Sequence, residues 1–178
     1  MALAACSSGP PPATFDLAQH QLATQGLRVR RQLVVSEPSA LQPLDSDRIL
    51  VRRADGTLAT LAHAQWSDRL PRLVQARTIQ AFENAGAVGR VGASGGPITA
   101  DLTLDVEIHA FEVDVGAGLA RVELAAKLVG ASSGRTVAAR IFTANVPAAG
   151  EGPSAVASFD QALGQILAEL TRWAASHL

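Results

Sequence analysis

Hydrophobic and polar residues alternate along two stretches of the second half of the chain, and this pattern predicts strands. Over residues 101–110, one face is apolar: Leu102, Leu104, Val106, Ile108 and Ala110. The other face is polar: Asp101, Thr103, Asp105, Glu107 and His109. Because successive side chains of a strand point to opposite sides of a sheet, we expect a half-buried strand with its polar face in solvent. Phe111 breaks the alternation, so we expect a bulge or the strand end there.

The second alternating stretch, residues 119–129, predicts a strand that pairs with the first. Its apolar face holds Val122, Leu124, Ala126 and Leu128, and its polar face holds Arg121, Glu123 and Lys127. One permitted antiparallel register sets Asp105 opposite Lys127 and Ile108 opposite Leu124. Shifts by two residues keep both faces, so the pattern predicts the faces and leaves the register open. Ser132–Gly134 then predicts a turn into a third strand over residues 135–146.

The first half of the chain predicts three more strands. Residues 27–35 begin with alternation and end with β-branched residues, which is typical of a strand. Residues 47–53 and 57–61 flank Asp55-Gly56, a dipeptide that supplies the positive φ of a hairpin turn. We therefore expect a hairpin over residues 47–61.

Helical spacing of apolar residues appears twice. The first set is Trp66, Leu70, Leu73, Val74, Ala81 and Phe82, and Gly86 is expected to end this helix as its C′ residue. Arg69, Arg72 and Arg77 are expected to lie away from the apolar face. The second set is Val156, Phe159, Leu163, Ile166, Leu170 and Trp173. Its seam is short and has few flanking charges, which favours packing on the protein's own sheet over a coiled coil.

These elements predict an α/β fold: a single domain, with a mixed and largely antiparallel sheet and two main helices packed on it. The chain has 178 residues, of which 48% are hydrophobic and 17% charged, enough for one compact domain over residues 15–178. No apolar run approaches the roughly 18 residues of a membrane span. A net charge of -1, with no basic segment interleaved with aromatics, argues against a nucleic-acid partner.

Residues 1–14 predict a separate function. The single cysteine, Cys6, follows Leu3-Ala4-Ala5 and precedes a Ser/Gly/Pro run. One cysteine forms no internal disulfide, and no ionisable neighbour in the sequence would activate it as a nucleophile. Leu3-Ala4-Ala5-Cys6 resembles the bacterial lipobox, in which the thiol receives a diacylglycerol and becomes the first residue of the mature protein. We therefore expect Cys6 to be the lipid attachment site and the following run to be a tether.

The stretch before Cys6 is shorter than a secretory leader. Only Met1–Ala5 precede the cysteine, whereas a signal peptide needs a positive segment and about 7–15 apolar residues. We expect a leader that was cut back or a misplaced start, and a chain that in this form is soluble and not acylated.

Two stretches match the G-x-S-x-G pattern of a nucleophile elbow and are candidate sites of a serine hydrolase. They are centred on Ser94, in Gly92–Gly96, and on Ser132, in Gly130–Gly134. The elbow needs a strand before it and a helix after it. The first match leads into Pro97 and a strand, and the second lies in an expected hairpin turn, so we expect no catalytic residue at either.

Metal and nucleotide sites are not indicated either. His20, His63, His109 and His177 lack the spacing of zinc ligands. Asp105, Glu107 and His109 share one strand face and could bind a cation, but a solvated polar face explains them better. There is no Walker A sequence and no G-x-G-x-x-G. We expect no cofactor, and any ATPase involved would be another chain.

The whole pattern resembles the ABC-type transport auxiliary lipoproteins, which include the paraquat-inducible protein C type. The resemblance rests on the lipobox-like start, "TFDL", "VSEPSAL", "DRILVRRADGTLATLAHAQWSDRLPRLV" and "AVASFDQALGQILAELTRWAASHL". It implies a periplasm-facing lipoprotein of the outer membrane, which Ser7 after the cysteine also fits. Its implied partners are an inner-membrane permease, an ATPase and an MCE-domain protein of a lipid transporter.

The resemblance carries no catalytic residues and is compatible with self-association. We therefore expect a non-enzymatic, lipid-anchored component. Two alternatives remain: a lipid-binding carrier, which would need an apolar pocket of a few hundred Å³, and a serine hydrolase, which would need Ser94 or Ser132 within about 3 Å of a histidine.

Overall fold

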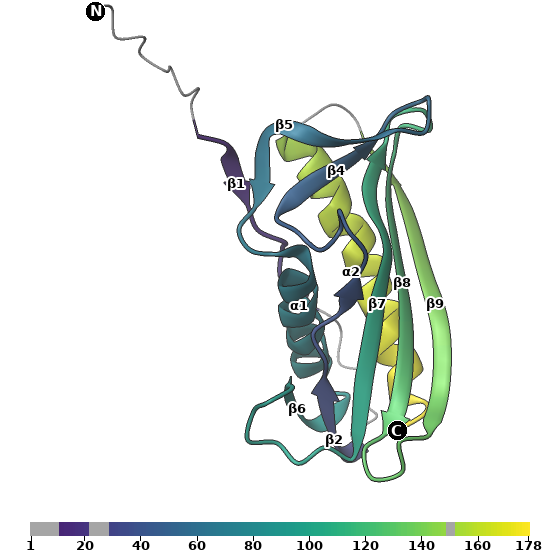
Figure 1. The fold of residues 1–178 in the computed structure, drawn as a ribbon. Helices are drawn as coiled ribbons and strands as arrows, with labels where there is room; N and C mark the ends of the chain where they lie inside the picture. Colours follow the sequence, from purple (N-terminus) through teal and green to yellow (C-terminus); the bar gives the residue numbers. More distant parts are fainter. Residues whose placement is uncertain (1–10, 22–28, 149–151) are drawn as a thin grey trace, which may run out of the picture.

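A meander of three long antiparallel strands forms the main part of the sheet (Figure 1). These strands are β7 (Leu102–Asp114), β8 (Leu119–Gly130) and β9 (Thr136–Pro147). The computed structural model describes residues 11–21, 29–148 and 152–178. Asp105 lies opposite Lys127 and Ile108 opposite Leu124. The pattern had left this register open; the two apolar faces it predicted are buried together.

The bulge expected near Phe111 is confirmed, one or two residues earlier. The register of β7 against β8 shifts between Ile108 and Ala110, so His109 is the extra residue. This shift brings Phe111 to the buried side, where it is 1% exposed. β7 therefore continues through the break in alternation at Phe111 and ends at Asp114.

Shorter strands pair with the other edge of β7. β2 (Val29–Val35), β3 (Ser39–Ala40) and β4 (Arg48–Arg52) each run parallel to it. The predicted hairpin is confirmed, since β4 pairs antiparallel with β5 (Leu58–Trp66) and Gly56 has φ +84°. Two edge strands complete the mixed sheet: β1 (Ala13–Phe15) is parallel to β5, and β6 (Val88–Ala93) is parallel to β2.

Both predicted helices pack on the sheet, as expected. They are α1 (Leu70–Ala85) and α2 (Pro153–Ala175), and α2 lies along β8 and β9 (Figure 1). All six apolar seam residues of α2 are buried. Phe159 stacks on Phe111 with ring centroids 4.8 Å apart, and Trp173 meets Phe142 edge-on at 5.5 Å. The seam of α2 is therefore used by its own sheet.

The expected start of the first helix at Trp66 is wrong. The Trp66 N–H donates to the Asp47 carbonyl at 2.8 Å, so β5 extends to this residue. The helix begins at Leu70, beside Pro71, whose ring suits the first turn. It ends as predicted at Gly86, which has a left-handed φ of 58°.

Candidate functional site

The N-terminal segment enters the body of the protein beside β5 and is held by both helices. Ala13–Phe15 forms β1, and the Ser67 N–H donates to the Phe15 carbonyl at 2.7 Å. Leu17 is buried in the core with 1% of its surface exposed. The predicted lipid attachment site, Cys6, lies outside the described residues. The segment that would connect it to the body is thus built into the fold from Ala13 onward.

Arg77 of α1 is the main polar attachment of this segment. Its guanidinium donates to the Leu17 carbonyl, to Asp16 Oδ2 at 2.6 Å and to Gln80 Oε1 at 2.8 Å. The Arg77 side chain is only 9% exposed. The expectation that Arg77 lies away from the apolar face is wrong, because the Leu17 carbonyl and Asp16 pair its charge there.

Three further contacts complete what we call the clamp, formed by Arg77, Gln80 and Asn84 of α1 and Asp160 and Gly164 of α2. The Ala18 N–H donates to Asp160 Oδ1 at 2.8 Å, and Asn84 donates to the His20 carbonyl at 3.0 Å. The His20 ring lies so close to Gly164 that a Cβ there would be 2.7 Å from ring atoms. Segment 16–20 is therefore held against α1 and α2 together.

Burial shifts the pKa of Asp160 in the clamp and of His20 in the segment that the clamp holds. Desolvation lowers the pKa of His20, with the nearby Asp160 opposing and Arg77 adding to that effect. Burial raises the pKa of Asp160, against the hydrogen bond from Ala18 and the charge of His20. His20 Nε2 is buried and has no partner within the described part of the chain. The clamp thus favours a neutral His20.

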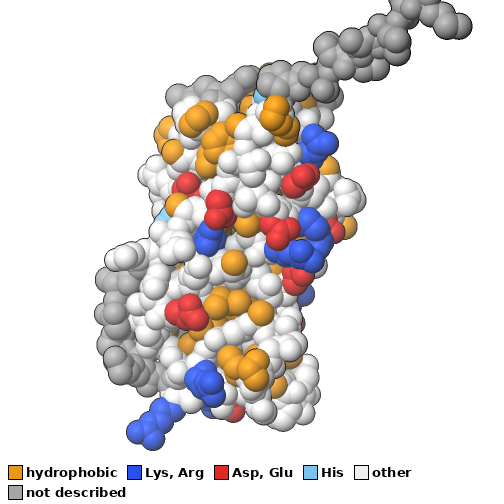
Figure 2. Space-filling model, turned by 90° about the vertical axis from the view of Figure 1, so that its left-hand side faces the viewer, with side chains coloured by type: hydrophobic (Ala, Val, Ile, Leu, Met, Phe, Trp, Pro, Cys, Tyr) orange, Lys and Arg blue, Asp and Glu red, His pale blue; other side chains and the backbone are white. Residues whose placement is uncertain are grey.

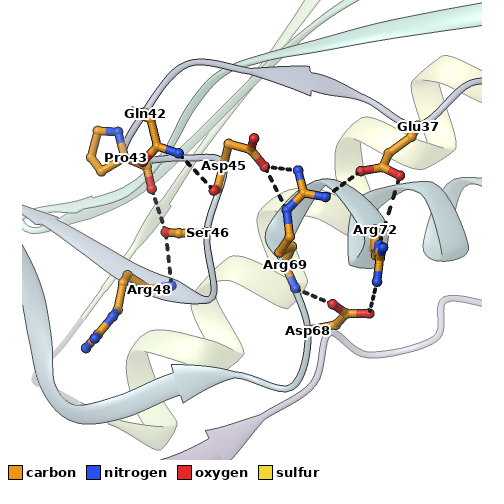
Figure 3. A network of polar contacts seen from close by, with 9 residues as sticks. All are labelled: Glu37, Gln42, Pro43, Asp45, Ser46, Arg48, Asp68, Arg69 and Arg72. Carbon is orange, nitrogen blue, oxygen red and sulfur yellow. Dashed lines mark hydrogen bonds and ion pairs between the residues drawn. The ribbon is translucent and has the colours of Figure 1, made fainter.

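A second polar cluster joins the start of α1 to the connection between β2 and β4 (Figure 3). We call Glu37, Asp45, Asp68, Arg69 and Arg72 the motif network, since all but Asp45 come from stretches that carry the family resemblance and Asp45 lies between two of these stretches. Arg69 donates from Nε to Asp45 Oδ1 at 3.0 Å and from Nη1 to Glu37 Oε1 at 2.9 Å. Arg72 lies 4.0 Å from Glu37 and 3.7 Å from Asp68. Arg69 and Arg72 are exposed in part, as predicted.

Next to the motif network, the loop of residues 41–46 faces solvent and is held by its own hydrogen bonds. Ser46 donates to the Pro43 carbonyl at 2.7 Å, and the Leu44 N–H donates to the Leu41 carbonyl at 2.8 Å. Leu41, at the start of this loop, is 79% exposed. Figure 2 shows charged side chains of both signs gathered near the middle of the face that carries α1. This face is therefore a candidate contact surface.

The outer face of the meander, away from the helices, is polar on β7 and nearly uncharged on β9. Glu123 accepts from Arg121 at 2.9 Å and lies 3.2 Å from His109 Nδ1, and these contacts, that of Arg121 first, lower its pKa. Toward β9 the surface has a shallow depression of about 400 Å³ lined in part by Ala125, Ala139 and Ile141. The described residues contain no group of three His, Cys, Asp or Glu side chains that could hold a metal ion.

Neither elbow-like serine lies in an elbow. Ser94 follows β6 and leads to β7, and Ser132 lies in the turn between β8 and β9. Both placements confirm the prediction that no helix follows. Within the described ranges, no hydrogen bond joins either serine to a histidine, and His109 instead contacts Glu107 and Glu123.

Taken together, the fold and the clamp define an α/β domain whose N-terminal segment is tied to both helices. A model of the ABC-type transport auxiliary lipoprotein component family matches residues 15–173. The chain belongs to this family, and lipoproteins of this kind are associated with the cell envelope. None of the described helices has the length and apolar character needed to cross a membrane.

Individual proteins are similar to this chain in sequence or in fold. The crystal structure of a Xanthomonas campestris protein has a TM-score of 0.85 at 30% identity, covering 93% of this chain and 95% of that one. That of an uncharacterized protein has the same fold, with a TM-score of 0.73 at 15% identity, covering 93% and 99%. An uncharacterized protein of Bradyrhizobium diazoefficiens is 35% identical over 167 residues, 90% of this chain. The chain spans 44% of that relative's length.

Proposed function

We propose that this chain is a non-enzymatic, lipid-anchored component of an ABC-type lipid transport system. In this proposal Cys6 carries the acyl chains, and the domain faces the periplasm from the outer membrane. An MCE-domain protein, an inner-membrane permease and an ATPase are its partners. The family match over residues 15–173 supports the transport assignment, and the sequence around Cys6 supports the anchor.

The clamp is the observation that carries the proposal. A domain that works at a membrane through a tether must resist being pulled away from it. Arg77, Asp160 and buried Leu17 connect the segment that follows the tether to α1, to α2 and to the core. Two or three acyl chains, at about 0.8 kcal/mol per buried methylene, would supply the membrane end of this connection.

Metabolic labelling tests the anchor. The full-length gene is expressed in its native host with an alkyne analogue of palmitate, beside a matched Cys6→Ser variant and a Ser8→Ala control. We expect label on the wild type and on Ser8→Ala, in the outer-membrane fraction, and none on Cys6→Ser. An unlabelled wild-type protein that is found outside the envelope would contradict the proposal.

Purification from membranes tests the transport role separately. The tagged wild-type protein is extracted in mild detergent after crosslinking, and the subunits recovered with it are identified. We expect a permease, an ATPase and an MCE-domain protein, each reduced with Cys6→Ser. Recovery of a labelled lipoprotein without any of these three subunits would remove the transport assignment and leave the anchor.

A further inference from the structure

β9 is a long edge strand whose protection against pairing is confined to its two ends and to Arg140. It has 12 residues and, in the described part of the protein, pairs on one side only, with β8. Edge strands are normally protected by lysine, by proline, by bulges or by a covering segment. Here the only proline is the terminal Pro147, the only charged residue is Arg140, and the register against β8 is regular except at Leu128/Val129.

The outward side chains of β9 are all uncharged: Val137, Ala139, Ile141, Thr143 and Asn145. Two of these five are large and apolar. Ile141 is 57% exposed and Val137 is 52% exposed. Ile141 also borders the depression that Ala125 and Ala139 help to line. The edge therefore offers free backbone groups together with apolar surface.

The sequence of β9 is close to its own reverse in side-chain size near Ile141. Around Ile141, an antiparallel copy of the strand would set Ala138 opposite Ala144 and Ala139 opposite Thr143. Arg140 would lie opposite Phe142, whose own-chain ring it already approaches at 4.8 Å. A register centred on Arg140 would instead oppose two guanidinium groups, which destabilises a cross-strand pair. The strand thus suits a second copy of itself, with Ile141 at the centre.

Charges on α2 agree with this arrangement. Arg140 donates to Glu169 at 3.0 Å, and Phe142 contacts Trp173, so the level of Ile141 corresponds to the stretch of α2 between these two residues. Arg172 lies in that stretch and is exposed. A twofold axis through Ile141 would bring Glu169 of one helix to the level of Arg172 of the other. The two copies would therefore present opposite charges to each other.

We propose that two copies of this chain associate by antiparallel pairing of β9 with β9 about a twofold axis at Ile141. The two meanders then form one continuous six-stranded sheet with α2 of both copies on the same face. This interface is isologous, since the same residues serve both copies. It does not depend on acylation of Cys6, and so it is separable from the proposed function.

Mass measurement of the purified Cys6→Ser chain over a concentration series tests the association. We expect a species of twice the 18.4 kDa of one chain. Ile141→Lys places two charges at the axis and should give the single-chain mass. Val115→Lys is the matched control, because Val115 is also 57% exposed but lies in the β7–β8 turn; it should leave the dimer intact. A single-chain mass at every concentration, or a dimer that survives Ile141→Lys, would overturn the proposal.

Oxidative crosslinking tests the register. Directly opposed residues of an antiparallel pair have Cα atoms about 4.5–5.5 Å apart, within disulfide range. In the Cys6→Ser background, Ile141→Cys should therefore form a covalent dimer on oxidation. Val137→Cys should not, because its two copies would lie about 27 Å apart along the strands. Crosslinking at position 137 in place of 141 would exclude the twofold pairing. So would the absence of crosslinking at both positions in a protein that has the mass of a dimer.

Discussion

Arg69 and Arg77 lie two turns apart at α1, and each attaches a distant segment to it through acidic groups. Arg69 binds Asp45 and Glu37 in the motif network, and its side chain is 40% exposed. Arg77 binds Asp16 and the Leu17 carbonyl in the clamp, and its side chain is 9% exposed. The bonding chemistry is almost the same at the two sites. Because the two sites differ in burial, we expect only the clamp to contribute a large part of the free energy of unfolding.

The reason lies in what remains after a partner is lost. If Arg69 is removed, water reaches Asp45 and Glu37, whose side chains are 31% and 41% exposed. If Arg77 is removed, the buried Leu17 carbonyl is left without its donor. An unsatisfied buried group costs its full desolvation penalty, whereas exposed ion pairs contribute little.

The largest expected effect is that of Arg77→Met, which keeps much of the side-chain volume and removes the donors. We expect the free energy of unfolding to fall by roughly 2 kcal/mol, the cost of leaving the buried Leu17 carbonyl without a donor. Urea unfolding measures the change, and limited proteolysis near residue 20 should become faster. Arg72→Met, on the exposed side of the same helix, is the control and should change neither readout. Equal effects of the two substitutions would remove the contrast between the buried and the exposed arginine.

The strands of the meander were predictable because their period of two residues extends over ten or more positions. β1, β3 and β6 were not, since the first two have three and two residues and β6 contains two glycines. Parallel pairing of β2, β3 and β4 with β7 also leaves no local signal, because the partners are far apart in the sequence.

The clamp was missed for a related reason. Arg77 stands on the apolar stripe of α1, between Val74 and Ala81, and this position was the available signal. A charged residue on such a stripe requires a partner, but the Leu17 carbonyl lies 60 residues away in the sequence. For the motif network, the sequence indicated only the stretches that resemble the family. That their charged residues meet in space depends on the fold.

Gly164→Ala tests whether the His20 ring packs on α2 in the clamp. We expect the coupling between the two positions to be about 1 kcal/mol in the free energy of unfolding. Alanine is favoured over glycine in a helix by about that amount. In the wild type the new Cβ would meet the His20 ring at 2.7 Å, so we expect this gain to be lost as the ring is displaced. In a His20→Ala background the ring is absent, and the gain should appear in full. Urea unfolding of the four proteins in this double-mutant cycle measures the coupling. The same gain in both backgrounds would mean that His20 does not pack on α2.

Arg69→Met tests the exposed side of the comparison and should have a smaller effect than either change in the clamp. We expect a minor decrease in the urea midpoint at low salt. The decrease should vanish near 1 M salt, because screening weakens exposed ion pairs. The effect of Arg77→Met should persist at that salt concentration. Unfolding curves at the two salt concentrations check both statements, and a loss for Arg69→Met that salt does not change would show that the motif network also bears on stability.

The smallest expected effect is a pH dependence confined to the clamp. Burial lowers the pKa of His20 below its ordinary value of 6.5, so near and below that pH the unfolded chain binds more protons than the folded one. The free energy of unfolding should therefore decrease as the pH falls from 7.5 to about 5.5 and recover as it rises. His20→Gln should flatten this dependence, whereas His177→Gln, at an exposed position, should leave it. Asp160 acts in the opposite direction and at lower pH. Its pKa is raised above the ordinary value of 3.8, so in that range the folded state binds more protons than the unfolded state and is stabilised as the pH falls. A wild-type dependence that survives His20→Gln would show that protons enter elsewhere and that the clamp does not require a neutral ring.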